Sequence, residues 1–206
     1  SIFREGLDYT LRSPPLRALI IGVLVVNLTA SSYAVLLPVF VHDIFTGDAR
    51  TLGWLWGAAG FGSLLSTVLL AGKQSVARLR GLILFSAIAS AVGLLLFASS
   101  RYLPLSLLAM AILGFGVTIN NVGTNILLQG QAPEALRGRV VSIYTSTRFG
   151  FDAIGGLLAG LLAAHIGGPW AMYIAAAVLA LYCAWPCRPC RPPSISPSTA
   201  ICGSAW

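Results

Sequence analysis

Two opposite charges stand in the middle of a long apolar stretch of this sequence. Arg148 and Asp152 lie four residues apart in the segment RFGFD, so a helix places them on one face. A charge inside a lipid bilayer costs at least about 2.5 kcal/mol, so both side chains are expected to face the bundle interior or a water-filled cavity. Two interpretations follow. Either the residues serve substrate binding or coupling, with Asp152 contacting a substrate cation or exchanging a proton, or they form a structural ion pair.

Amide side chains are a second group of candidate binding residues. Asn121, Asn125 and Gln129 recur every four residues and therefore share one helical face, where they can donate and accept hydrogen bonds. Asn27 lies in an earlier apolar stretch. We therefore take Asn27, Asn121 and Asn125 as candidates for substrate contact. The alternative is hydrogen bonding between helices, with an average contribution of about 0.6 kcal/mol.

The composition indicates the solvent that these residues meet. Of 206 residues, 57% are hydrophobic and 9% are charged, against about 25% charged residues in a typical soluble domain. A bilayer core of about 30 Å takes roughly 20 helical residues. Six apolar stretches are long enough to cross it, at roughly 17–41, 52–72, 81–100, 103–128, 140–164 and 170–186. The sequence predicts an all-α polytopic membrane protein with six transmembrane helices and no room for a soluble catalytic domain.

Basic residues predict the orientation of these helices, because Arg and Lys collect beside cytoplasmic loops. Ten of them flank one side of the predicted spans, namely Arg4, Arg12, Arg17, Lys73, Arg78, Arg80, Arg137, Arg139, Arg188 and Arg191. The other side carries only Arg50 and Arg101. We therefore expect a multi-pass protein of the cell membrane with both termini in the cytoplasm. The net charge of +7 is spread over four membrane-flanking sites, which argues against nucleic acid as a partner.

The two ends of the chain differ from its apolar middle. Residues 1–15 carry apolar residues at four-residue spacing followed by two prolines, so we expect a cytoplasmic lead-in or linker helix. The six-helix bundle is expected over residues 16–186. Residues 187–206 are rich in Cys, Pro and Ser, which predicts a disordered or aberrant tail. Cys187 and Cys190 form a CxxC without further ligands at a familiar spacing, so no metal site is expected.

Polar residues are concentrated in four of the six predicted spans. The first, second, fourth and fifth spans carry Asn, Ser, Thr or charged residues, whereas the third and sixth carry little beyond an occasional serine. We expect the four polar spans to face a wet path and the other two to face lipid or pack behind them. The pattern repeats every three spans, which predicts two three-helix repeats. The spacing of Gly53 with Gly57 and of Gly156 with Gly160 predicts close packing of helix backbones.

A family resemblance rests on four stretches of sequence. The most specific is QAPEALRGRVVSIYTSTRFG at 131–150. It is accompanied by EGLDYTLRSPPLRAL near the start, LGWLWGAAGFGSLLSTVLLAG in the second span and GGLLAGLLA in the fifth. From about residue 3 to about residue 182, the chain resembles the carboxy-terminal six-helix half of a major facilitator superfamily exporter. The most similar branch is the bacterial drug and siderophore efflux group, which includes enterobactin exporters.

The resemblance implies a twelve-helix transporter in which these six spans form the second bundle, with the first, second, fourth and fifth spans lining the cavity. It also implies a missing amino-terminal six-helix half as a partner. Arg137, Gly138 and Arg139, in the loop before the fifth span, are expected to hold a cytoplasmic gate; the alternative is that the two arginines only anchor topology. The connection AGKQSVARLRG keeps the basic cluster of a family loop motif but lacks its usual acidic residue.

The expected function is therefore part of a secondary active exporter. It moves amphipathic small molecules outward by alternating access, and the resemblance implies the proton gradient as the energy source. Its expected surroundings are the lipid bilayer and a small-molecule substrate, and neither a cofactor nor enzymatic activity is expected. The alternatives are a non-transporting membrane scaffold, a truncated inactive half-transporter, and half of an ABC-type permease, for which a GxxxxGK[ST] motif is lacking.

Overall fold

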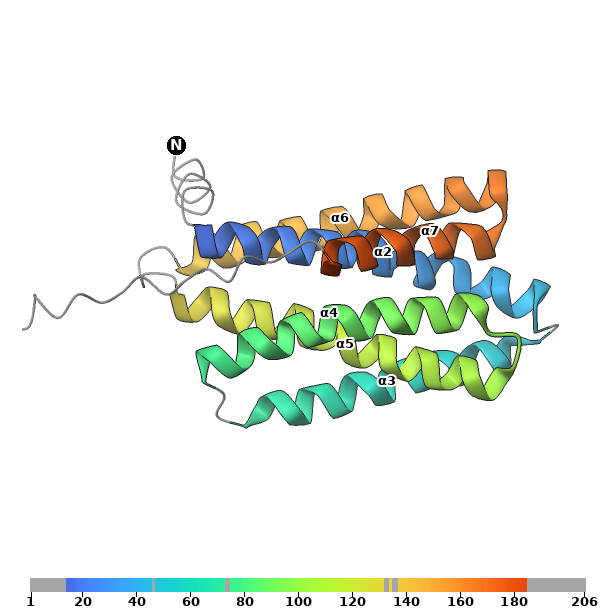
Figure 1. Ribbon diagram of the computed structural model, residues 1–206, viewed down its shortest axis with the longest axis horizontal. Coiled ribbons are helices and arrows are strands. Elements are labelled where there is room, and N and C mark those ends of the chain that lie inside the picture. The colour runs from blue at the N-terminus through green and yellow to red at the C-terminus, as the bar shows by residue number, and fades with distance from the viewer. Residues whose placement is uncertain (1–13, 46, 73–74, 132–133, 135–136, 185–206) are drawn as a thin grey trace, which may run out of the picture.

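The computed structural model describes residues 14–45, 47–72, 75–131, 134 and 137–184. Within these ranges the chain forms α2 (Pro14–Asp43), α3 (Ala49–Ala71), α4 (Val76–Ser99), α5 (Leu103–Gln131), α6 (Arg137–Ile166) and α7 (Gly168–Ala184), as Figure 1 shows. The described residues contain helices and no strand, which confirms the all-α prediction. Most of the predicted lead-in helix and all of the predicted tail lie outside the described residues.

Five of the helices, α2 to α6, are long and apolar enough to cross a membrane. The sequence predicted six spans. Helix α7 is apolar, but its 17 described residues fall short of the roughly 20 that a bilayer core requires. The predicted sixth span at 170–186 runs past the last described residue.

The helices lie side by side and alternate in direction (Figure 1). Helices α2, α6 and α7 form one layer, and α3, α4 and α5 form the other, with α4 and α7 in contact between the layers. Because the directions alternate, the start of α2, the α3–α4 connection and the α5–α6 connection share one end of the bundle. Arg78, Arg80, Arg137 and Arg139 therefore gather at that end.

Local sequence signals explain where several helices begin. Helix α2 starts at Pro14, where the fixed backbone angle of proline suits a first helical residue. From the sequence, the two prolines predict only the end of a preceding helix. Helix α3 is capped by Asp48, whose Oδ1 accepts hydrogen bonds from the backbone N–H groups of Arg50 at 3.0 Å and Thr51 at 3.1 Å. Between α6 and α7 the chain turns at Gly167, where φ is 87°.

Close helix packing depends on glycines that the sequence analysis did not single out. A Cβ added at Gly62 of α3 would overlap the Ala111 carbonyl of α5, and a Cβ at Gly114 of α5 would overlap the Ala59 carbonyl of α3. A Cβ at Gly155 of α6 would likewise overlap the backbone of α2. By contrast, nothing lies within 4 Å of a Cβ built at Gly53 or Gly57. The packing predicted for the Gly53 and Gly57 pair is therefore wrong within this chain.

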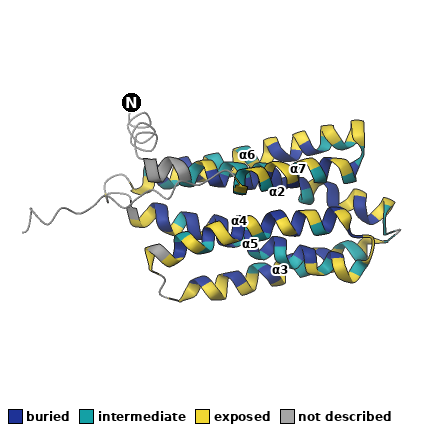
Figure 2. Cartoon of the chain, viewed as in Figure 1, coloured by how far each residue is buried: buried dark blue, intermediate teal, exposed yellow. Residues whose placement is uncertain are grey.

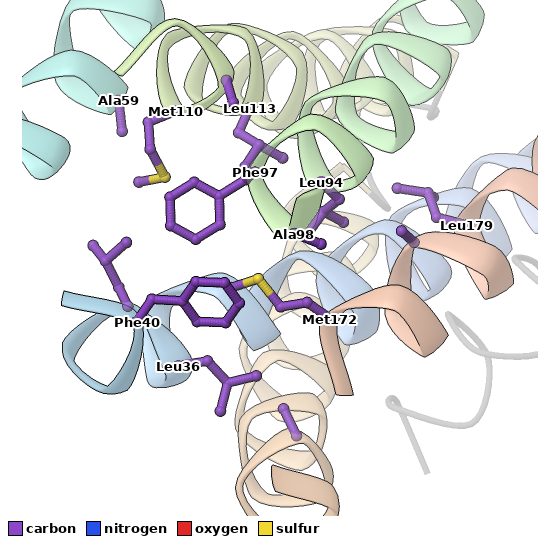
Figure 3. Packing of buried hydrophobic residues seen from close by; sticks show 14 of the residues in the cluster. Leu36, Phe40, Ala59, Leu94, Phe97, Ala98, Met110, Leu113, Met172 and Leu179 are labelled. Atoms are coloured by element: carbon purple, nitrogen blue, oxygen red, sulfur yellow. The ribbon is translucent and has the colours of Figure 1, made fainter. Parts of the chain in front are cut away.

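The hydrophobic core joins the two layers. The rings of Phe40 in α2 and Phe97 in α4 lie with centroids 5.1 Å apart, and Met110 and Met172 flank them (Figure 3). Buried side chains follow the inner helix faces, and exposed ones follow the outer faces (Figure 2). Helices α4 and α7 contact each other and present large apolar side chains outward, but α3 and α6 do so as well, so this exposure does not distinguish the third and sixth predicted spans from the others.

Candidate functional site

A polar cavity of about 270 Å³ lies between α2, α5 and α6. Its lining consists of Tyr33, Val117, Thr118, Asn121, Val122, Asn125, Tyr144 and Arg148. Three of the five residues proposed from the sequence for substrate binding or coupling, Arg148, Asn121 and Asn125, therefore line one space. The remaining two, Asn27 and Asp152, lie outside the lining.

Asn27 and Asn121 form a reciprocal amide pair between α2 and α5. Nδ2 of Asn27 donates to Oδ1 of Asn121 at 2.9 Å, and Nδ2 of Asn121 donates to Oδ1 of Asn27 at 3.3 Å. Nδ2 of Asn27 also donates to the Val23 carbonyl at 2.8 Å, so Asn27 is directed away from the cavity and holds Asn121 in place. Both asparagines are buried, with exposed fractions of 4% and 5%.

Tyr144 ties the third helix to this pair. Its hydroxyl donates to the backbone carbonyl of Asn121 at 2.6 Å, which links α6 to α5. The side chain of Tyr144 also packs with Val23, Leu128 and Val140 in a small apolar cluster below the cavity. The three cavity helices are thus held together by polar bonds at their centre, where a lipid environment offers no competing water.

Arg148 places an unpaired cationic group in the cavity wall. The residue is half-buried, and its Nε atom is buried without a hydrogen-bond partner. The guanidinium carbon lies 4.9 Å from the centroid of the Phe149 ring, within cation–π range. Tyr144, one helical turn earlier on α6, interacts with Arg148 electrostatically. Among the residues that the structure describes, the guanidinium therefore has aromatic neighbours and no ion-pair partner.

Asp152 lies one turn beyond Arg148, at the middle of the 30-residue helix α6. Its side chain is exposed, and no ion pair or hydrogen bond joins it to Arg148. The structural ion pair considered as one interpretation is therefore not formed. Asp152 interacts electrostatically with Tyr33 of α2, but it does not belong to the cavity lining.

Asn125 forms the other polar part of the cavity wall. It is half-buried, and its Oδ1 accepts a hydrogen bond from Nε2 of Gln129 at 2.9 Å. The three amides that share this face of α5 therefore have different partners. Asn121 forms hydrogen bonds to α2, whereas Asn125 and Gln129 form a hydrogen bond to each other along α5. The sequence pattern identified the face but not this division.

Many hydroxyl groups that suggested a wet face in the first span are in fact buried. Thr29, Ser31 and Ser32 donate to carbonyl groups of their own helix at 2.7, 3.2 and 2.6 Å. Their exposed fractions are 3%, 6% and 2%. The expectation that they face a wet path is wrong, because hydroxyl groups in a helix can bond to the preceding turn and need no water.

Five of the eight cavity residues were missed as site residues by sequence reasoning, namely Tyr33, Val117, Thr118, Val122 and Tyr144. A signal existed for Tyr144, since it precedes Arg148 by four residues on the same helical face. No such signal existed for Tyr33, whose approach to the cavity depends on how α2 packs against α5 and α6. Its ring also lies 6.0 Å from that of Trp56, so α3 approaches the cavity through this contact.

Arg137, Gly138 and Arg139 are the first three residues of α6 rather than part of a loop. Cations at a helix start oppose the helix macrodipole, at a cost of about 0.3–1 kcal/mol each. Helix stability therefore does not explain this placement. An anionic membrane surface at this end of the bundle would offset the cost.

The fold and this cavity together define a multi-pass α-helical membrane protein with a polar space between its helices. The chain belongs to the Transmembrane secretion effector family of the major facilitator superfamily, whose family model matches residues 1–195. Members of this superfamily are transporters of the membrane rather than enzymes.

The relatives are bacterial exporters. The chain is 32% identical over 164 residues to the multidrug efflux pump Tap of Mycolicibacterium fortuitum, covering 79% of this chain and 40% of the relative. It is 30% identical over 160 residues to the enterobactin exporter EntS of Shigella flexneri, covering 77% of this chain and 37% of the relative. The same exporter from Escherichia coli O81 (strain ED1a) is 30% identical over 162 residues, with 77% and 38% covered. The chain thus spans about two fifths of the length of these relatives.

Proposed function

We propose that this chain is the carboxy-terminal six-helix half of a proton-coupled exporter that moves amphipathic small molecules of the drug or siderophore type out of the cell. The observation that carries the proposal is the polar cavity between α2, α5 and α6, located at mid-helix in a chain whose relatives are exporters. An amino-terminal six-helix half is the partner that would complete the path. Both termini of this chain then face the cytoplasm.

Two inverted three-helix repeats, α2–α4 and α5–α7, are part of this proposal. In such an arrangement α2 corresponds to α5 and α3 to α6, so the contact of α3 with α5 should have a counterpart in the contact of α6 with α2. Both contacts are extensive, and both bring backbones together at a glycine, Gly62 of α3 in one and Gly155 of α6 in the other. This correspondence supports alternating access by rocking of one repeat against the other.

Within the cavity we assign Arg148, Asn121 and Asn125 to substrate contact and Asn27 to holding Asn121. Asp152 is the proton-exchanging group, because it is the one acid in the middle of a described span, whereas Asp43 is the last residue of its span. Arg137, Gly138 and Arg139 form the cytoplasmic gate at the start of α6. Their position at a helix end that faces anionic lipid supports this role.

Dye efflux tests the proposed function. The chain is expressed alone, and also joined behind the amino-terminal half of the Mycolicibacterium relative, in cells that lack their main efflux pumps. We expect the chain alone to insert without extruding dye and the joined protein to extrude it until a proton uncoupler is added. Efflux by the chain alone would contradict the half-transporter assignment. Efflux that resists the uncoupler but stops on ATP depletion would favour an ABC-type mechanism, and insertion without any efflux would favour a scaffold.

Charge neutralisation in the joined protein tests the site. A coupling site predicts that Asp152→Asn keeps its membrane level and loses efflux, and that adding Arg148→Gln does not restore it. A structural pair would instead lower the protein level in each single variant and recover it in the double variant. Normal efflux in all three variants would remove both residues from the mechanism.

A further inference from the structure

The cavity holds a cation without an anion. Nε of Arg148 is buried and has no hydrogen-bond partner, although arginine offers five N–H donors. A buried donor without a partner is uncommon, since buried polar groups in folded proteins are nearly always satisfied. Asp152 is the nearest acid along the helix, yet it is exposed, lies outside the cavity lining and forms no ion pair with Arg148. The other acids that the structure describes, Asp43, Asp48 and Glu134, lie in or beside connections at the bundle ends.

The neighbours of Arg148 leave the donors on its two terminal nitrogens available, whereas Nε itself is buried. The Phe149 ring faces the guanidinium at 4.9 Å, and stacking of this kind leaves the in-plane N–H groups free for another partner. Tyr144, on the same face of α6, uses its hydroxyl hydrogen to bond the Asn121 carbonyl. No described side chain therefore competes for the fork of donors that the cavity presents.

The rest of the lining suits the remainder of a small organic anion. Val117 and Val122 provide apolar surface, and the rings of Tyr33 and Tyr144 provide aromatic surface. Asn125 adds an amide that can donate to a second anionic oxygen. A volume of about 270 Å³ falls just below the range of about 300–1,000 Å³ typical of ligand pockets, so one small molecule or one part of a larger substrate fits.

We propose that Arg148 makes this cavity a binding site for the carboxylate, sulfonate or phosphate group of an amphipathic anion. The planar guanidinium matches two oxygens of such a group, and Asn125 completes the contact. This inference rests on the proposed function, because it assumes that the cavity is part of the substrate path. What it adds is that the substrate carries a negative charge. A transported solute is the occupant; an anionic lipid headgroup offers the same chemistry and is separated from it by the test.

The test uses two probes with the same apolar body and opposite charge, 2-naphthalenesulfonate and 2-naphthyltrimethylammonium. Binding to the purified chain in phosphatidylcholine nanodiscs is measured by calorimetry. We expect the sulfonate to bind and the ammonium to bind at least tenfold more weakly. Arg148→Gln should weaken sulfonate binding by about 10- to 100-fold, the range for a charge-assisted hydrogen bond, and Arg148→Lys should retain part of it. Arg101→Gln, at an exposed arginine outside the spans, is the matched control and should change nothing.

The Asp152→Asn variant distinguishes an anion site at Arg148 from a cation site at Asp152. Removing a negative charge near the anion should leave sulfonate binding unchanged or tighter. Preferential binding of the ammonium probe, lost in Asp152→Asn, would overturn the anion site while leaving the exporter intact. Equal sulfonate binding by wild type and Arg148→Gln, or no sulfonate binding at all, would also overturn it.

Including phosphatidylglycerol should not alter sulfonate affinity, and competition by this lipid would assign the site to a headgroup instead. Dye efflux is measured separately from sulfonate binding. Efflux without sulfonate binding would overturn only the anion site, and sulfonate binding without efflux would overturn only the proposed function.

Discussion

The amide pair between α2 and α5 permits a quantitative test of how this bundle is held together. Replacing Asn121 with leucine removes both hydrogen bonds of the pair and leaves Oδ1 of Asn27 buried without a donor, while Nδ2 of Asn27 keeps its bond to Val23. Replacing Asn27 with leucine strands both polar atoms of the Asn121 amide. At an average of about 0.6 kcal/mol for each bond between membrane helices, either single variant should lose about 1–2 kcal/mol of unfolding free energy.

The decisive quantity is the unfolding free energy of the double variant with Asn27→Leu and Asn121→Leu. Because Asn27→Leu and Asn121→Leu together leave no stranded amide, the double variant should be about 0.5–1.5 kcal/mol more stable than the sum of the two single losses. The bond from Tyr144 to the Asn121 backbone survives in every variant and keeps α6 in place. The unfolding free energy is measured by circular dichroism as the denaturing detergent fraction is raised.

A matched control comes from the second amide contact on the same helix. Gln129→Ala removes the exposed bond to Asn125 and should change the unfolding free energy by less than about 0.5 kcal/mol. Additive losses in Asn27→Leu and Asn121→Leu, within about 0.5 kcal/mol, would refute the coupling inferred from the pair. Losses as small as that of the control would show that the amides contribute nothing to helix association.

Three further perturbations test other parts of the structure. Gly114→Ala should destabilise the bundle by about 1–3 kcal/mol, because the new methyl group overlaps the backbone of α3, whereas Gly53→Ala meets nothing within 4 Å and should be neutral in the same detergent titration. Gly167→Ala should lower the unfolding free energy by about 1–2 kcal/mol through its φ of 87° alone, since no atom lies near the added methyl group. Gly160→Ala, inside α6, is the control, and equal effects of the two substitutions would exclude backbone strain. Hydrogen bonds from the first turn of α3, above all from the Thr51 backbone N–H, hold the pKa of the Asp48 carboxyl below its ordinary value of 3.8. The cap therefore stabilises the helix fully above pH 3.8 and loses its effect as the pH falls through the lower pKa of the folded state. Asp48→Ala should for this reason narrow the difference in unfolding free energy between pH 7 and pH 3. An unchanged pH profile would contradict the cap.

Much of the candidate site was predictable because helix periodicity relates residues on one helix. The spacing of Asn121 with Asn125 placed both on one face of α5, and both line the cavity. The cost of a buried charge placed Arg148 toward the interior, where the structure has it half-buried. Whether Arg148 pairs with Asp152 was not predictable, since a four-residue spacing permits an ion pair but does not require one, and the rotamers depend on neighbouring helices.

The sequence by itself determined that this chain is an all-α membrane protein, where its spans run and to which superfamily it belongs. The first two properties follow from hydrophobicity and length, which act along the chain and need no tertiary contact, whereas the superfamily follows from specific motifs, above all the one at 131–150. Only the tertiary structure decided that Asn27 pairs with Asn121, that Tyr33 reaches the cavity and that Gly114 rather than Gly53 is the point of close packing. Each of these depends on the rotation of one helix against another. That rotation is set by the fit of many side chains between helices, and no repeat in a single helix encodes it.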